Sequence, residues 1–186
     1  MLLSTLIVTI LGLRCLTSTE TANRRFDLEF YEFICKNIAN RILVFECSFK
    51  KLELPNHYVF RQYLMFNKDM GENFEVRFWV HIRPSSSKTG MRFIDLKIKA
   101  CDVLDNYLEN PLLKKIFFEL QRTANLPHMC PFKANFLYKT ENYTANTKLV
   151  PNYMPILNFT FGVEYYEKTQ LIGVLKIIGA TVPKKN

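Results

Sequence analysis

Hydrophobic and polar residues alternate along most of this chain. Residues 73–82 read NFEVRFWVHI, so that one face carries Phe74, Val76, Phe78, Val80 and Ile82 and the other carries Glu75, Arg77, Trp79 and His81. A period of two is typical of a β-strand with one side in the core. The same pattern predicts strands at residues 41–49 and 156–166, and weaker alternation predicts five more at 25–34, 57–67, 91–99, 132–139 and 171–181.

About eight strands separated by turn-rich connections, such as RPSSSKTG at residues 83–90, predict a mainly β protein. Short antiparallel strands of this kind pack as two sheets face to face. We therefore expect an antiparallel β-sandwich. No second-domain linker or internal repeat interrupts the pattern, and we assign residues 20–186 to a single domain.

One segment has a helical period instead. Within residues 101–125, helical spacing places Leu112, Leu113, Ile116, Phe117 and Leu120 on one face. Asn110 suits the N-cap of such a helix and Pro111 suits its first turn. We expect a short helical insertion between strands, beginning at Cys101 and ending shortly before Cys130.

The first 19 residues have the form of a secretory signal peptide. About a dozen mostly apolar residues precede small and polar ones, and the run is shorter than the roughly 20 residues that span a bilayer. Cleavage removes Cys15 and leaves four cysteines, which allow three pairings. The sequons at Asn142 and Asn158 fit the same compartment. We therefore expect a secreted, extracellular glycoprotein with disulfide bonds.

Composition and charge exclude several other classes. Hydrophobic residues make up 48% of the 186 residues, which is too many for a disordered chain. The net charge of +8 comes from scattered basic pairs such as Lys50 with Lys51 and Lys114 with Lys115, as on a solvated basic surface. No nucleic-acid recognition motif accompanies these pairs, so we expect no nucleic acid partner.

The sequence carries no pattern for catalysis or for a cofactor. No G-x-S-x-G or comparable nucleophile motif is present, and the only imidazoles are His57, His81 and His128. His128 and Cys130 offer two ligands for zinc, but no second pair completes a tetrahedral site nearby. We expect neither an enzyme nor a metal or cofactor protein.

Aromatic residues are the more informative feature. The chain has 16 Phe and 9 Tyr, many at inward strand positions. Such rings either fill the space between the sheets as an ordinary core or line a cavity for an apolar ligand, and composition does not distinguish these readings. The residues we expect to line such a cavity are Phe45, Phe60, Phe78, Phe159 and Phe161.

The segment FIDLKIKACDVLDN…NPLLKKIFFELQRTANLPHMCPF resembles a family of insect secreted proteins within the ML superfamily of lipid-recognition proteins. Its Ile-x-x-Cys-x-x-Leu element corresponds to Ile98, Cys101 and Leu104, and its Asn-Pro helix start to Asn110 and Pro111. Its Ser-Asn-x-x-His-x-Cys-Pro-aromatic element corresponds to Asn125, His128, Cys130, Pro131 and Phe132. Ala124 stands where the family has Ser. Upstream, Cys35 and the CSFKKLEL run from Cys47 resemble the family's first cysteine and its Cys-x-x-Lys strand.

The resemblance implies an immunoglobulin-like two-sheet sandwich that opens between its sheets to hold a lipid. Combined with the position of the helical insertion, it implies a bond between Cys101 and Cys130, and then one between Cys35 and Cys47. The alternative for the second bond is that Cys35 pairs with a cysteine on a distant strand. It also implies a non-enzymatic, monomeric carrier of a lipid or other apolar small molecule. Some members of the family are associated with chemosensory organs and pheromone response.

The alternative function is a closed sandwich that docks on a membrane receptor or channel without a ligand. In that case, the basic surface and the face with Trp79 would carry the contacts. A void of about 300 Å³ or more between the sheets would favour ligand binding over docking.

Overall fold

A computed structural model describes residues 25–53, 56–104 and 109–184. Within them the elements follow the order β1 (Phe26–Asn37), β2 (Ile42–Lys51), β3 (Tyr58–Phe66), β4 (Phe74–Pro84), β5 (Met91–Lys99), α2 (Ala100–Leu104), α3 (Pro111–Thr123), β6 (Tyr138–Ala145), the 3-10 turn η2 (Thr147–Leu149), β7 (Leu157–Glu167) and β8 (Gln170–Pro183). The expected leader, residues 1–19, lies outside the described residues. No helix in the described ranges is long and apolar enough to cross a membrane.

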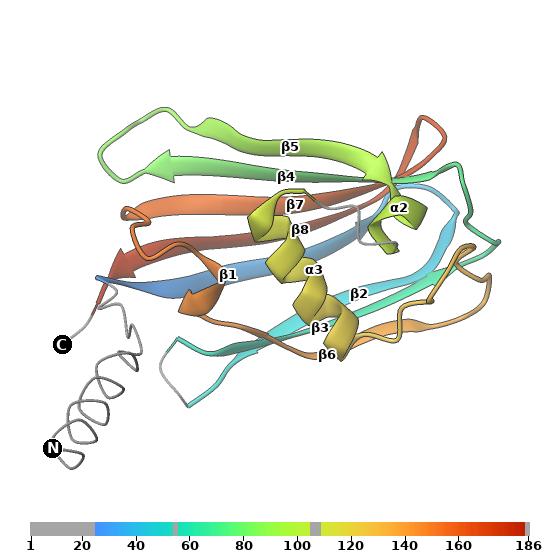
Figure 1. Cartoon of the computed structure of the whole chain (residues 1–186), viewed down its shortest axis with the longest axis horizontal. Helices are drawn as coiled ribbons and strands as arrows, with labels where there is room; N and C mark the ends of the chain where they lie inside the picture. Colours follow the sequence, from blue (N-terminus) through green and yellow to red (C-terminus); the bar gives the residue numbers. More distant parts are fainter. Residues whose placement is uncertain (1–24, 54–55, 105–108, 185–186) are drawn as a thin grey trace, which may run out of the picture.

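The strands form a sandwich of two antiparallel sheets (Figure 1). The larger sheet has the order β1-β8-β7-β4-β5, and the smaller has the order β2-β3-β6. The prediction of a mainly β sandwich with about eight strands is confirmed. Its first two strands belong to different sheets, so the chain crosses from one layer to the other between β1 and β2.

The alternation in the sequence correctly identifies the inner faces of the central strands. In β4, Phe74, Val76 and Val80 are buried, whereas His81 on the opposite face is exposed. Strand β7 pairs with β4 so that Phe78 lies opposite Val163. The two strands therefore present one continuous apolar surface to the smaller sheet.

The predicted strand at residues 132–139 is wrong, because the strand begins only at Tyr138. The stretch before it is a loop that follows the cis Cys130–Pro131 peptide, and Asn135 has a left-handed φ of 55°. Phe132 exchanges backbone hydrogen bonds of 2.8 Å with Met70 and is buried among other rings. Phe132 is therefore a core residue on a loop, whereas Phe136 is exposed. The strand β6 itself has a largely polar sequence and therefore lacks the alternation by which the other strands are recognised.

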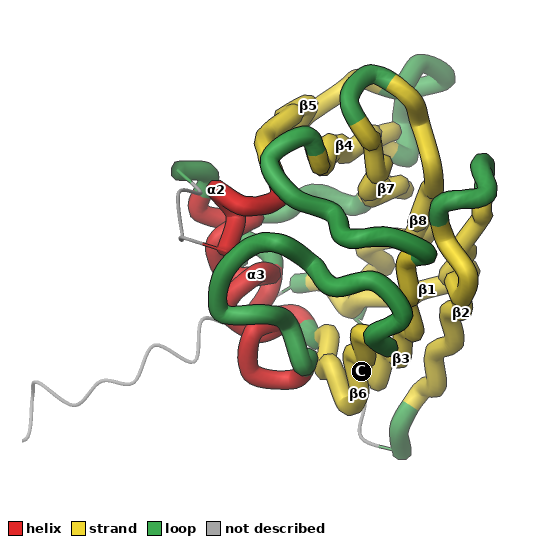
Figure 2. The backbone as a smooth tube through the Cα atoms, turned by 90° about the vertical axis from the view of Figure 1, so that its right-hand side faces the viewer, coloured by secondary structure: helices red, strands yellow, loops and turns green. Residues whose placement is uncertain are grey.

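Both helices lie along one side of the sandwich, away from β1 and β2 (Figure 2). The predicted start of the longer helix is confirmed: Asn110 is its N-cap, and its Oδ1 accepts hydrogen bonds from the backbone N–H groups of Leu112 (3.0 Å) and Leu113 (3.2 Å). Leu113 and Phe117 of α3 are buried against the sheets. The helical insertion therefore covers the side of the sandwich that β5 and β6 leave open.

Two disulfides fasten the opposite sides of the sandwich. Cys35 of β1 bonds to Cys47 of β2, which ties one sheet to the other at their shared edge. Cys101 of α2 bonds to Cys130 in the loop after α3. These are the pairs that the family resemblance implied.

Candidate binding site between the sheets

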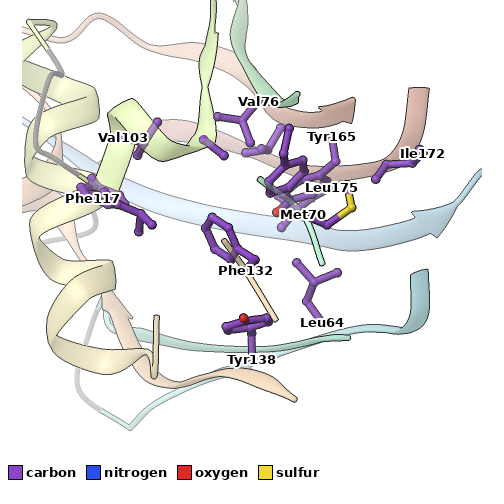
Figure 3. Close-up of a cluster of buried hydrophobic side chains, with 14 of the residues drawn as sticks. Leu64, Met70, Val76, Val103, Phe117, Phe132, Tyr138, Tyr165, Ile172 and Leu175 are labelled. Atoms are coloured by element: carbon purple, nitrogen blue, oxygen red, sulfur yellow. The ribbon is translucent and has the colours of Figure 1, made fainter. Parts of the chain in front are cut away.

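A cavity of about 290 Å³ lies between the two sheets. Its walls come from the inner faces of both sheets, from α2 and α3, and from the segment between β6 and β7. Figure 3 shows part of this interior, with Phe117 reaching in from α3 and Phe132 lying between the two layers. The volume is close to the lower limit of the range for small-molecule pockets, roughly 300–1,000 Å³.

Most of the lining side chains are apolar. The larger sheet contributes Leu28, Phe30, Phe33, Phe74, Val76, Phe78, Val80, Ile82, Phe93, Leu157, Phe159, Phe161, Val163, Leu175 and Ile177. Binding of an apolar ligand in the cavity is therefore favoured by about 25 cal/mol for each Å² of apolar surface removed from water.

The cavity wall reaches the surface at the edge strand β5. Val80 pairs with Ile94 and His81 pairs with Arg92, which leaves Phe93 without a partner in β4. Phe93 is thus the extra residue of a β-bulge, and its side chain borders the cavity while 57% of it is exposed to solvent. An entrance at this edge would need no strand to separate from its neighbour.

Four of the five predicted phenylalanines line the cavity: Phe60 from the smaller sheet, and Phe78, Phe159 and Phe161 from the larger one. Phe45 does not line it. Its ring lies edge-on to Tyr165, with 5.6 Å between centroids, on the side where β2 approaches β8. Gly173 permits that approach, because a Cβ atom there would stand 2.6 Å from Ile42 Cδ1 and 3.2 Å from Phe45 Cε1. The two sheets therefore pack directly against each other at Phe45, and the cavity does not extend to this residue.

The wall formed by the helix was not predicted as part of the site. Helical spacing singled out its apolar face, and the structure places Leu112, Leu113, Ile116, Phe117 and Leu120 on the cavity. Leu149, Val150 and Met154 line it from the segment before β7. The spacing of α3 predicted an apolar face correctly, but no feature of the sequence tells what that face covers.

A few polar groups interrupt the apolar walls. Gln62 Nε2 donates a hydrogen bond to the hydroxyl of Tyr165 at 3.4 Å, and both residues line the cavity. Burial raises the pKa of Tyr165 to about 12. Burial also raises the pKa of Tyr143, a third lining residue, well above its usual value. These phenols stay protonated at neutral pH and act as neutral hydrogen-bonding groups.

The residues considered for metal chemistry do not come together. Cys130 is held in a disulfide and His128 is exposed. Across the described ranges, no group of three or more His, Cys, Asp or Glu side chains is placed to hold a metal ion.

The outer face of the larger sheet is a network of ion pairs around Trp79. Arg77 bonds Asp95 (2.6 Å) and Glu164 (3.2 Å), and the Trp79 indole N–H donates to Glu164 at 3.1 Å. The Arg77 guanidinium, through its hydrogen bonds, holds the pKa of the Asp95 carboxyl well below its usual range. Trp79 is half-buried and fixed in this network.

The two sequons occupy different surroundings. Asn142 is exposed on β6 with a left-handed φ of 61°. Asn158 is half-buried on β7, between Arg83 of β4 and Ala180 of β8. Asn142 is therefore the more accessible acceptor for a glycan.

Residues 74–161 match a family model described as "Protein of unknown function (DUF1091)". The match covers just under half of the chain and runs from β4 through α3 and β6 into β7. It contains Cys101 and Cys130 as well as the capped start of α3. None of the curated proteins matches the chain.

Proposed function

We propose that this chain is a secreted, non-enzymatic protein of the ML type that holds a lipid or another apolar small molecule between its two sheets. The cavity of about 290 Å³ with mostly apolar walls is the observation that supports this function. The two disulfides support an oxidising compartment. Hydrophobic signals such as those of chemosensory systems belong to the class of ligand proposed.

The architecture suits a carrier because different contacts hold the two sheets together on the two sides of the sandwich. At the β1 and β2 side, the Cys35–Cys47 bond and the packing of Phe45 hold the sheets together. At the other side, the cavity is covered by α3 and by the segment after β6 rather than by paired strands. A ligand can therefore enter beside α3 without breaking a backbone ladder.

The second candidate function is docking on a receptor or channel without a ligand. The outer face with Trp79 and Arg77 would carry it, since Trp and Arg are common interface anchors. That candidate is weaker, because Trp79 and Arg77 already bond to Glu164 and would have to exchange those contacts for a partner's.

Uptake of an apolar fluorescent probe tests the proposal. Purified, oxidised full-length protein should enhance the fluorescence of N-phenyl-1-naphthylamine, and fatty acids, sterols or long-chain hydrocarbons should displace it. The variant Ile116→Trp adds volume to a side chain that lines the cavity, and it should weaken probe binding at least tenfold.

Phe118→Trp is the matched control. Phe118 lies on the same helix but is 63% exposed and does not line the cavity, so this variant should bind the probe like the wild type. A folded wild-type protein that takes up no probe and contains no lipid by native mass spectrometry would contradict the proposed function. Equal binding by both variants and the wild type would place the ligand elsewhere.

A further inference from the structure

The inner face of β3 contains one amide among apolar and aromatic side chains. The residues on this face are Tyr58, Phe60, Gln62, Leu64 and Phe66. An amide that faces a cavity between sheets loses its hydration and needs hydrogen-bond partners. Gln62 is therefore the position on the inner face of β3 where an amide stands in place of the apolar side chain that a purely apolar interior requires.

Gln62 is only partly satisfied by the protein. Its side chain has two N–H donors and a carbonyl acceptor. Within the described residues, the single hydrogen bond of this side chain is the one from Nε2 to the Tyr165 hydroxyl, which is long at 3.4 Å. Among the described residues, every side-chain N or O atom that is fully buried has a hydrogen-bond partner. The carbonyl oxygen of the Gln62 amide has none among these residues and is therefore accessible, and Gln62 borders the cavity.

Tyr165 supplies the other half of this polar pair from the opposite layer. It lies on β7 of the larger sheet and is 9% exposed. Its hydroxyl oxygen accepts from Gln62, which leaves its own proton free to be donated. The pair thus offers an acceptor on the amide and a donor on the phenol, side by side and between the two sheets.

We propose that Gln62 and Tyr165 form the polar subsite of the cavity, which binds one neutral hydroxyl or carbonyl group of an otherwise apolar ligand. This inference rests on the proposed function and names the class of ligand. A neutral group is favoured because a charged one would lose its hydration among apolar walls. The two cationic residues that border the cavity, Arg61 and Lys139, are both exposed to solvent.

A purely structural role for the pair makes a different prediction. If the bond only joins the two sheets, its loss changes stability but not the choice between ligands. If the pair is a subsite, its loss changes the relative affinity of ligands with and without the polar group, since a site built to bond a hydroxyl discriminates against the analogue that lacks it.

The experiment compares dodecan-1-ol, dodecane and dodecanoate as competitors of N-phenyl-1-naphthylamine on the wild type and on Gln62→Leu and Tyr165→Phe. For each protein, the affinity for dodecan-1-ol is divided by the affinity for dodecane. Comparing this ratio between the wild type and a variant cancels the difference in hydration between the two ligands. We expect the ratio to fall about fivefold or more in each variant, with the affinity for dodecane kept or improved.

Tyr63→Phe is the matched control, because it deletes a phenolic oxygen next to Gln62 on β3 but from the opposite face of the strand, where the hydroxyl donates to Glu141 outside the cavity. It should leave the alcohol to alkane ratio unchanged. Tyr165→Phe removes one atom, and near-ultraviolet circular dichroism verifies that it folds; Gln62→Met serves as the second substitution at the amide.

The possible results separate the two proposals. Unchanged ratios in the Gln62 and Tyr165 variants, or an equal loss in Tyr63→Phe, would overturn the subsite. A larger loss for dodecanoate than for dodecan-1-ol would overturn the assignment to a neutral group. If the wild type binds no probe at all, the proposed function fails instead.

Discussion

The indole of Trp79 lies against Gly162, its partner across the ladder between β4 and β7. A Cβ atom added at Gly162 would stand 2.6 Å from Trp79 Nε1 and closer still to two ring carbons. The indole keeps this place because its N–H donates to Glu164 at 3.1 Å, and Glu164 also pairs with Arg77. Because Gly162 has no side chain, the Trp79 indole has room to join the ion-pair network on the outer face.

Replacing Gly162 by Ala should destabilise the protein by about 1–3 kcal/mol, the usual cost of overpacking. The indole must move off the sheet, which breaks its bond to Glu164. Urea unfolding gives the free energy of unfolding, and the fluorescence of Trp79, the single Trp of the chain, should shift to longer wavelength.

Gly71→Ala is the control for this substitution. An added Cβ at Gly71 meets only Pro131 Cβ at 3.8 Å, an ordinary contact, and its φ is not positive. This variant should unfold like the wild type. Equal stability of the wild type and Gly162→Ala would mean that Trp79 is not held against the sheet.

The two disulfides should differ in what they control. In the chain-entropy model, replacing Cys101 and Cys130 together by Ala costs roughly 3.5 kcal/mol, and replacing Cys35 and Cys47 costs roughly 3 kcal/mol, because the first bond closes the longer loop. Urea unfolding of the two double variants measures both losses.

Ligand exchange distinguishes the two bonds more sharply. The Cys101–Cys130 bond anchors the segment that carries α3 over the cavity, so its removal should speed the release of a bound apolar probe in stopped-flow measurements. Removal of Cys35–Cys47, at the opposite edge, should leave the release rate nearly unchanged. The reverse order would contradict entry beside α3.

Stability should fall in alkaline solution because of Tyr165. Burial raises the folded-state pKa of Tyr165 to about 12 from an ordinary value near 10. The folded state holds the phenolic proton more tightly than the unfolded state, so the contribution is complete below about pH 10 and is lost as the pH rises towards 12. The loss is on the order of 1.4 kcal/mol for each pKa unit of the shift.

Unfolding free energies at pH 8, 10 and 11 measure this slope. Tyr165→Phe should make it shallower, with a remaining slope from the buried Tyr143, whereas Tyr153→Phe, at a side chain 86% exposed, should follow the wild type. A wild-type stability that stays constant over this range would show that the Tyr165 hydroxyl is open to water when the protein is folded.

Local patterns predicted the elements well where one physical signal dominated. The alternation around Phe78 and Phe161 identified strands and their inner faces, because a half-buried strand requires it. Asn110 and Pro111 fixed the start of α3, because capping depends only on neighbouring backbone groups.

The same signals failed where distant contacts decide. The alternation around Phe132 predicts a strand there, but Phe132 lies on a loop and is buried by its contacts with Met70 and Tyr138. Phe45 was assigned to the cavity from its inward position, but Gly173 on another strand lets the sheets close there.

The sequence by itself determined that this chain is a β-sandwich with a capped helix, because periodicity and capping are local properties. Only the tertiary structure decided where the sheets stay apart and which polar groups meet between them. The pairing of Gln62 with Tyr165 joins residues 103 positions apart in the chain, and their distance depends on how two whole sheets pack. No local pattern carries that information.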